Sequence, residues 1–322
     1  MKTILATTFL ICTAAYAQDP PAVSSGTLVA NFNSDPSTMD FVKGTNDLTA
    51  WRAANNASIV LDGVGTQTEN IAFDQDALDG HGALVVNDMS GQNRYLMGSI
   101  GNGLSNATIF WVGYFNPGQN GSIGDGSGQY IYDLGADGAN GTQMDAQIDD
   151  GIFEIYGGSS TQAGANISDL NGVYSTWMTK FYAAPTTVGH EAYVNGTNLD
   201  VGTTSDGYQT DENLVLFAYQ NSSGTGSSGY NFVGNIHQLL IYDGVLDEAD
   251  TAAVTAYLDC KLDPNCNPPC GADFNDDGMI DASDLGMLLA AWGLSGATDL
   301  TNDGTTDAAD LGLLLAGWGA CS

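Results

Sequence analysis

The stretch Thr108-Ile-Phe-Trp-Val-Gly-Tyr-Phe115 indicates the fold class of most of the chain. Its β-branched and aromatic residues favour an extended strand. Similar short runs follow at Gln129-Tyr-Ile-Tyr-Asp-Leu134 and Leu214-Val-Leu-Phe-Ala-Tyr219. Many short strands with regular turns are typical of a β-sandwich or jelly roll. We therefore expect residues 24 to about 246 to be all-β.

Asn-Gly and Asp-Gly dipeptides separate these runs, and both residue types accept the positive φ angles of tight hairpins. They occur at Asn120-Gly121, Asn140-Gly141, Asp150-Gly151, Asn171-Gly172 and Asn195-Gly196. The segment Leu246–Leu258 instead predicts a helix, because acidic residues occupy its first turn, where the helix dipole favours them.

Residues 259–269 contain three prolines and predict a short, stiff linker between a domain of residues 18–258 and a domain of residues 270–322. An even number of cysteines in an exported chain implies disulfides. The four beyond the N-terminal segment allow three pairings, of which we favour Cys260–Cys266 in the linker and Cys270–Cys321 across the last domain.

The N-terminus, residues 1–17, predicts a secretion signal. Lys2 precedes a twelve-residue apolar stretch that is too short to span a bilayer, and Ala15-Tyr16-Ala17 has the small-x-small form of a cleavage site. A lipoprotein role for Cys12 is disfavoured by the bulky Ile11 before it. We expect a secreted protein, extracellular or at the cell surface, that begins at Gln18.

The net charge of −32, with only six Lys and Arg, is strongly acidic. Nucleic-acid binding needs cations that displace phosphate counterions, so nucleic-acid partners are excluded, and anionic membranes are disfavoured for the same reason. Acidic side chains instead suit divalent cations.

The last domain contains an internal repeat. Residues Asp273 to Gly293 match Asp299 to Gly319 at a constant offset of 26 residues. Two copies so close in sequence imply two copies of one structural unit.

Each copy has the spacing of a calcium loop, in which positions 1, 3, 5, 7, 9 and 12 supply oxygens and a glycine at position 6 makes the turn. In loop one, with Gly278 at the turn, the predicted ligands are Asp273, Asn275, Asp277, Met279 (by its carbonyl), Asp281 and Asp284. In loop two, with Gly304 at the turn, they are Asp299, Thr301, Asp303, Thr305, Asp307 and Asp310. Thr301 is a poorer ligand than Asn or Asp, so we expect loop two to bind calcium more weakly.

A short helix follows each loop. Its apolar residues recur at i, i+3, i+4 and i+7, so we expect one apolar face per helix and packing of the two faces against each other. These residues are Leu285, Leu288, Leu289 and Trp292 after loop one, and Leu311, Leu314, Leu315 and Trp318 after loop two.

The duplicated loops, with Asp at position 12, the Leu-Gly-x-Leu-Leu-Ala-x-Trp-Gly helices and the flanking cysteines resemble a bacterial dockerin-type domain. The resemblance implies two F-hand calcium sites and a docking or anchoring role. Dockerins of cellulosomes bind cohesins through loop positions 10 and 11. Here those positions hold Ala282, Ser283, Ala308 and Ala309 without a Ser-Thr pair, so the partner is left open as a cohesin-like or other surface receptor.

The larger domain resembles the laminin-G-like, concanavalin A-like jelly roll. The resemblance rests on Ala107–Tyr114, on Trp177–Tyr182 followed by Glu191-Ala-Tyr-Val-Asn-Gly196, and on Phe232–Leu246 with the helix after it. It implies recognition of carbohydrates or proteins, catalysis in a few relatives, and in some relatives a further calcium ion, for which no ligands are assigned.

The sequence patterns of several common catalytic sites are absent from the chain. No Gly-x-Ser-x-Gly elbow occurs, and His190-Glu191 lacks a second histidine at the helical spacing. His81, His190 and His237 are expected to be strand or turn residues. The nearest acidic cluster does not have the Glu-x-Asp-x-x-Glu spacing of jelly-roll glucanases; it consists of Asp145, Asp149, Asp150 and Glu154.

Tyrosines beside Gly- and Asn-rich loops are candidates for stacking on sugar rings, although core packing is the simpler reading of any one of them. They are Tyr130, Tyr132, Tyr156, Tyr208 and Tyr230.

The sequence therefore predicts a secreted, non-catalytic binding or adhesion protein, whose jelly roll recognises carbohydrate or a surface ligand and whose calcium-dependent tail mediates anchoring or assembly. The alternatives are a secreted polysaccharide-degrading glycoside hydrolase or its accessory subunit, and a structural surface-layer component. Two buried carboxylates in a groove would favour the hydrolase, and a flat polar β-face would favour the structural component.

Overall fold

The structure is a computed structural model of the chain. It describes residues 19–64, 71–78, 81–86, 95–115, 129–135, 144–149, 152–157, 160–161, 165–170, 172–183, 189–199, 210, 212–220, 226–227, 232–262, 272–275, 279–296, 298–301 and 304–320. The chain forms two compact units, Asp19–Leu262, here called the sandwich, and Asp263–Ser322, here called the tail unit. The predicted signal segment lies outside the described residues.

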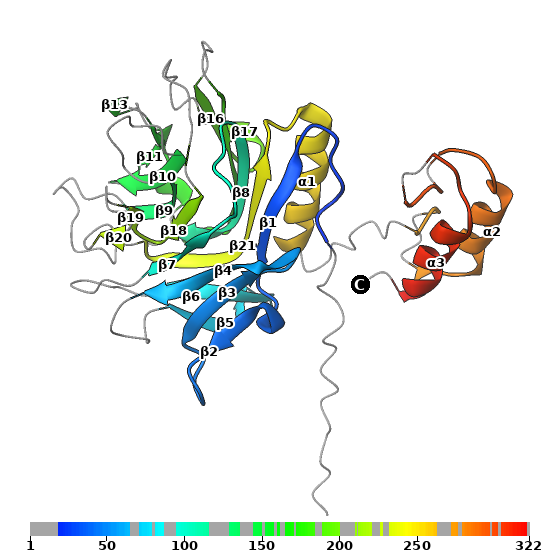
Figure 1. The fold of residues 1–322 in the computed structure, drawn as a ribbon, viewed down its shortest axis with the longest axis horizontal. Helices are drawn as coiled ribbons and strands as arrows, with labels where there is room; N and C mark the ends of the chain where they lie inside the picture. Colours follow the sequence, from blue (N-terminus) through cyan, green and yellow to red (C-terminus); the bar gives the residue numbers. More distant parts are fainter. Residues whose placement is uncertain are drawn as a thin grey trace, which may run out of the picture. The chain divides into compact units, whose positions relative to one another are not determined.

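The sandwich consists of two antiparallel sheets (Figure 1). The eight-stranded sheet has the order β17-β16-β15-β8-β21-β6-β5, with β1 also pairing with β21. Its strands are β1 (Thr27–Asn33), β5 (Ile71–Leu78), β6 (His81–Val86), β8 (Ala107–Phe115), β15 (Ser175–Phe181), β16 (His190–Val194), β17 (Thr197–Asn198) and β21 (Gly234–Asp243).

The nine-stranded sheet has the order β14-β11-β10-β9-β18-β7-β4-β3-β2. Its strands are β2 (Met39–Phe41), β3 (Leu48–Ala53), β4 (Asn56–Val64), β7 (Tyr95–Ser99), β9 (Gln129–Leu134), β10 (Met144–Asp149), β11 (Ile152–Glu154), β14 (Ala165–Asn166) and β18 (Asn213–Leu216). The sandwich also contains two short ribbons and two 3-10 turns. The ribbons are β12 (Tyr156–Gly157) with β13 (Ser160–Thr161) and β19 (Tyr219–Gln220) with β20 (Gly226–Ser227), and the turns are η1 (Pro36–Thr38) and η3 (Ser168–Leu170).

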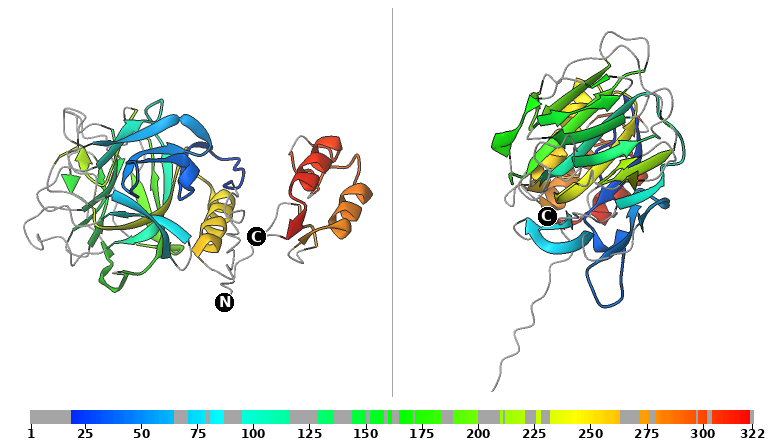
Figure 2. Two further views of the ribbon diagram at one scale, coloured as in Figure 1. Left: turned by 90° about the horizontal axis from the view of Figure 1, so that it is seen from below. Right: turned by 90° about the vertical axis from the view of Figure 1, so that its left-hand side faces the viewer.

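The main core lies between the two sheets, which Figure 2 shows from two further directions. Trp111 and Trp177 stack at its centre with ring centroids 4.9 Å apart, and Phe153 stacks on Trp177 from the nine-stranded sheet. Strands that alternate into this core explain the aromatic and β-branched runs of the sequence. The mainly-β sandwich predicted for the larger domain is confirmed.

A second, smaller core lies on the outer face of the eight-stranded sheet, under helix α1 (Glu248–Leu262). Along β8, Ile109 and Trp111 point into the main core, whereas Phe110 and Val112 pack in this second one. Both faces of the strand are therefore buried, which accounts for its unbroken run of apolar residues.

Helix α1 continues to Leu262, four residues into the segment predicted as a linker. Its last turn includes Cys260, which is disulfide-bonded. The other cysteines lie outside the described residues, so the predicted pairings stay predictions.

The tail unit contains two helices, α2 (Ala282–Ala290) and α3 (Ala308–Ala316), and a short ribbon of β22 (Met279–Ile280) with β23 (Gly319–Ala320). Ala272, Ile280, Leu288 and Leu314 form its small buried core. No helix among the described residues of either unit is both long and apolar enough to cross a membrane.

Candidate functional site

The carboxylate at position 12 of loop one is completely buried. Asp284 Oδ1 accepts a hydrogen bond from the backbone N–H of Phe274 at 2.8 Å, and Oδ2 accepts one from Asp281 at 2.9 Å. Asp281 in turn caps α2 by accepting from Ser283 N at 2.7 Å, which completes a capping box. Position 9 and position 12 of the loop are thus fixed by the start of the helix.

Loop two repeats this arrangement. Asp310 is completely buried and accepts from the backbone N–H groups of Asp307 at 2.7 Å and Thr301 at 2.9 Å, while Asp307 caps α3. The backbone N–H groups of Asp307, Thr301 and Leu300 hold the pKa of Asp310 below its ordinary value. The buried carboxylate is therefore ionised at neutral pH.

These buried charges have no cationic side chain within their own segment. Residues 270–322 contain nine aspartates and no Lys, Arg, His or Glu. A buried carboxylate is costly unless it is paired or coordinates a metal. Asp284 Oδ1 and Oδ2 each accept one N–H and keep a second lone pair, which suits them to a hard divalent cation.

Three predicted ligand positions of loop two converge. The Thr301 hydroxyl donates to Asp310 Oδ1 at 3.1 Å and lies 3.4 Å from Asp299 Oδ1, so positions 1, 3 and 12 face one another. Gly304, at the turn position, has φ +96° and donates its N–H to Asp299 Oδ2 at 2.8 Å. The glycine is needed there because L side chains rarely adopt that φ.

The described residues of loop one are arranged in a way that is compatible with the predicted calcium loop. Asp273, at position 1, is 9% exposed, while the side chains of Asn275 and Met279 lie at the surface. The position-5 aspartates Asp277 and Asp303 lie outside the described residues, and within the described residues no three acidic, His or Cys side chains form a group that could hold a metal. The residues present fit calcium, and the complete ligand sets stay predictions.

The two halves of the tail unit exchange backbone contacts. Ile280, at position 8 of loop one, pairs with Gly319 after α3, whereas Thr306, at position 8 of loop two, bonds to Gly293 and Leu294 after α2. Each loop is therefore closed by the segment that follows the other helix. Each half of the tail unit therefore depends on the other for the closure of its loop.

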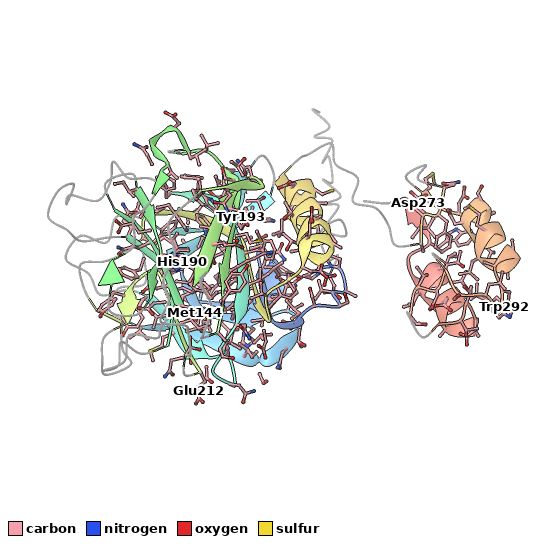
Figure 3. The ribbon with its side chains drawn as sticks, turned by 90° about the horizontal axis from the view of Figure 1, so that it is seen from above. Met144, His190, Tyr193, Glu212, Asp273 and Trp292 are labelled. Atoms are coloured by element: carbon pink, nitrogen blue, oxygen red, sulfur yellow. The ribbon has the colours of Figure 1, made fainter. Side chains whose placement is uncertain are left out.

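The predicted apolar helix faces are only partly buried. Leu288 and Leu314 are buried, but Leu289, Trp292, Leu315 and Trp318 are each about half exposed. The prediction that all four residues of each helix pack inward is therefore wrong. The small core includes Leu288 but not the adjacent Leu289. Trp292 lies beyond Ala290, the last residue of α2, so helical spacing no longer applies to it (Figure 3).

The described tyrosine candidates do not form an open stacking surface. Tyr130 is 6% exposed and packs against Tyr219, and the fully buried Tyr132 hydroxyl lies 2.5 Å from Thr179 Oγ1 in the main core. Both residues are packed in the interior, the simpler reading of the sequence, so neither presents an open ring face for stacking on a sugar. The Tyr156 side chain, Tyr208 and Tyr230 lie outside the described residues.

The structure brings together carboxylates that spacing alone did not pair. Asp145 lies directly opposite Asp133 across β9 and β10, and both are completely buried. Glu154 accepts a hydrogen bond from Gln147 at 2.7 Å in the next strand pair. The turn predicted at Asn140-Gly141 lies between β9 and β10 in the sequence. It indicates that the two strands pair, but not the register that places Asp133 opposite Asp145. The Asp149 side chain and Asp150 lie outside the described residues.

The histidines belong to strands, as expected. His190 is 1% exposed, and burial lowers its pKa to about 4. His237 Nδ1 lies 2.5 Å from the Gly82 carbonyl oxygen and 3.0 Å from Ser34 Oγ. His81 is the first residue of β6.

No protein-family model matches the sequence, and no curated protein matches it. Among solved structures the chain is similar to domain 4 of AbnA, an extracellular arabinanase of Geobacillus stearothermophilus in complex with arabinotriose. The identity is 17%, the match covers 72% of this chain and 100% of that chain, and the TM-score is 0.44.

Two further structures are similar. The binding domain of Paraclostridial Mosquitocidal Protein 1 shares 13% identity over 72% of this chain, with a TM-score of 0.47, and Trypanosoma rangeli sialidase shares 12% over 77%, with a TM-score of 0.42. The chain spans 52% of the first of these and 35% of the second. The likeness is one of fold.

Proposed function

We propose that this chain is an exported binding protein whose sandwich recognises a carbohydrate and whose tail unit folds around two calcium ions to attach to a protein partner. The observation that carries the proposal is the pair of completely buried aspartates, Asp284 and Asp310, in a segment that has no basic residue. Calcium supplies the positive charge that the sequence of the tail unit lacks.

The surface of the tail unit supports an attachment role. Large apolar side chains remain exposed on so small a unit, and exposed apolar groups of this kind mark interaction surfaces. They are Met279, Met287, Leu289, Trp292, Leu294, Leu313, Leu315 and Trp318. Ala282, Ser283, Ala308 and Ala309, at the predicted recognition positions, are also exposed. The partner fitting this surface has an apolar centre and a basic rim, because the unit's charged side chains are all acidic.

Polysaccharide binding tests the role of the sandwich. The mature protein, from Gln18 to Ser322, is incubated with insoluble and soluble polysaccharides in calcium and separately in chelator, and the bound fraction is measured. We expect the protein to bind one class of polysaccharide. A shorter chain that ends at Leu262, the last residue of α1, should retain this binding. Failure to bind any of them would overturn carbohydrate recognition and favour a structural surface role.

A second function, glycoside hydrolysis, is supported by Asp133 and Asp145. A retaining glycosidase needs two carboxyl groups about 5 Å apart, and directly opposite residues place their Cβ atoms about 4.5–5.5 Å apart. Both residues are completely buried, however, and catalysis requires contact with substrate. Burial therefore favours binding over catalysis.

Release of reducing sugar from the bound polysaccharide distinguishes the two functions. Binding without release supports the binding protein. Release that is lost in Asp145→Asn, and retained in Asp169→Asn, a variant at an exposed aspartate, would establish the hydrolase instead.

A further inference from the structure

A pocket of about 430 Å³ lies in the sandwich between β15 and the start of α1. Small-ligand sites range over roughly 300–1,000 Å³. Thr176, Met178 and Lys180 alternate along β15 and therefore share the face that lines the pocket. Tyr193, from the neighbouring β16, lies on the same wall, on the side of the sheet near α1 (Figure 3).

Helix α1 forms the opposite wall. Glu248, Thr251 and Thr255 line the pocket, and their spacing of three and four residues places them on one face of the helix. The segment 245–247 between β21 and α1 closes the end of the pocket. This site is separate from the inter-sheet core and from the buried aspartates of β9 and β10.

Lys180 places a cation in the pocket wall. The residue is 8% exposed, and its Nζ donates to the Leu246 carbonyl oxygen at 2.7 Å. An ammonium group has three N–H donors, so it can also donate to a ligand oxygen. Burial lowers the pKa of Lys180, and the charges of Glu191 and Asp247 oppose that shift.

Two tyrosines give the pocket aromatic surface. Tyr182 and Tyr193 are both half-buried lining residues. The Tyr182 hydroxyl donates to Glu191 Oε2 at 2.7 Å, which fixes the ring against the sheet. Aromatic walls with a few fixed polar groups are the usual construction of a site for a small polar ligand.

The charges select the class of ligand. The charges of Glu191 and Asp247 act on the Lys180 ammonium, Glu248 adds a third carboxylate to the pocket lining, and the chain carries a net charge of −32, so an anionic ligand is repelled. A cationic ligand would meet the Lys180 ammonium. A neutral molecule with many hydroxyl groups and an apolar ring face satisfies the donors, the acceptors and the tyrosines together.

We infer that the pocket between β15, β16 and α1 binds a neutral hexose unit of a glycan, with Tyr193 against the ring face and Lys180 donating to a ring hydroxyl. The inference rests on the proposed carbohydrate-binding function and gives that function a location. It also assigns a specificity, since neutral saccharides are taken and acidic ones are rejected.

Calorimetric titration of the mature protein tests it. The probes are cellotetraose, laminaritetraose and mannotetraose, with tetragalacturonic acid as the acidic counterpart. Thr255→Trp fills the pocket from the helix and removes only one hydroxyl, and Ala253→Trp adds the same ring at an exposed position of the same helix. Tyr193→Ala removes the ring contact, and Lys180→Met is matched by Lys43→Met at the surface.

We expect a neutral tetrasaccharide to bind, and Thr255→Trp, Tyr193→Ala and Lys180→Met each to weaken binding about tenfold or more. Ala253→Trp and Lys43→Met should bind like the unmodified protein. A thermal melt of each variant separates lost binding from lost folding.

Other outcomes overturn the inference in distinguishable ways. Binding that survives Thr255→Trp places the carbohydrate site elsewhere and leaves the proposed function standing. Binding of the acidic tetrasaccharide alone overturns the assigned specificity. No binding of any saccharide by the unmodified protein overturns both the inference and carbohydrate recognition.

Discussion

Trp111 and Trp177 lie face to face between the two sheets, with ring centroids 4.9 Å apart and 3° between the ring planes. They are directly opposite each other on β8 and β15, so the stack belongs to one cross-strand pair. Phe115 meets Trp177 edge-on and Phe232 meets Trp111 edge-on. One aromatic cluster therefore joins the centre of the eight-stranded sheet to the rest of the core.

Replacing Trp177 by Ala should destabilise the sandwich by about 3–5 kcal/mol, because it leaves a large cavity and removes the ring that stacks on Trp111 and Phe153. Urea unfolding followed by far-UV circular dichroism measures the change. Trp318→Ala, at an exposed position in the tail unit, should change the unfolding of the sandwich by less than about 0.5 kcal/mol. Equal losses in the two variants would show that the stack contributes no special stability.

Calcium should increase the helical signal of the tail unit, and the double variant Asp284→Asn, Asp310→Asn should lose this response, because each substitution removes a buried ligand charge. Both side chains also complete the capping boxes by accepting the backbone N–H of the N-cap residue, Asp281 or Asp307, and a lost capping interaction costs about 1 kcal/mol. If capping were their whole role, millimolar calcium would restore the signal in the double variant. Ser283→Ala, between two predicted ligands but exposed, is the matched control.

The two loops should differ in affinity. Thr301→Asp should tighten the weaker site about tenfold, since a carboxylate replaces a hydroxyl that now lies between Asp299 and Asp310. The reciprocal change at the matching position of loop one, Asn275→Thr, should weaken the tighter site by a similar factor. Calorimetric calcium titration resolves the two sites. The same affinity before and after Thr301→Asp would contradict the assignment of position 3.

Acid should destabilise the sandwich partly through His190. Burial lowers the folded-state pKa to about 4, whereas an unfolded histidine titrates near 6.5. The unfolded chain therefore binds the extra proton first, so this contribution to stability is complete above about pH 6.5 and is lost as the pH falls toward 4.

In His190→Gln the stability lost between pH 7 and pH 4 should be smaller than in the unmodified protein, by up to about 3 kcal/mol. Urea unfolding at the two pH values gives the comparison, and taking the difference between the variants cancels the titration of the carboxylates. Identical pH dependence would mean that burial does not lower the pKa of His190.

Local pattern was sufficient for the strands. The run expected at 108–115 is β8, Ala107–Phe115, because a strand buried on both faces needs an unbroken apolar sequence. The helix expected from Leu246 begins at Glu248, where Asp247 accepts a hydrogen bond from Asp250 N at 2.9 Å. Both features are encoded within about ten residues of sequence.

The exposure of individual side chains could not be predicted from the local sequence. Tyr130 and Tyr132 have the loop-flanking positions of surface residues, but their burial depends on Tyr219 and Thr179, which reach them only after the sheets pack. Leu289 has the spacing of a core residue and remains exposed, because the tail unit is too small to bury a second leucine of the same turn. The Asp133–Asp145 pair required the hairpin register, which a one-residue slip would have abolished.

The central position of β21 has a consequence for the order of events during synthesis. Its hydrogen-bonding partners are β1, β6 and β8, all of which emerge long before residue 234. Until then the eight-stranded sheet lacks the strand that joins its two parts, and pairings across more than 200 residues are slow to form. A chain that emerges from its N-terminus therefore cannot complete the eight-stranded sheet until its last quarter appears.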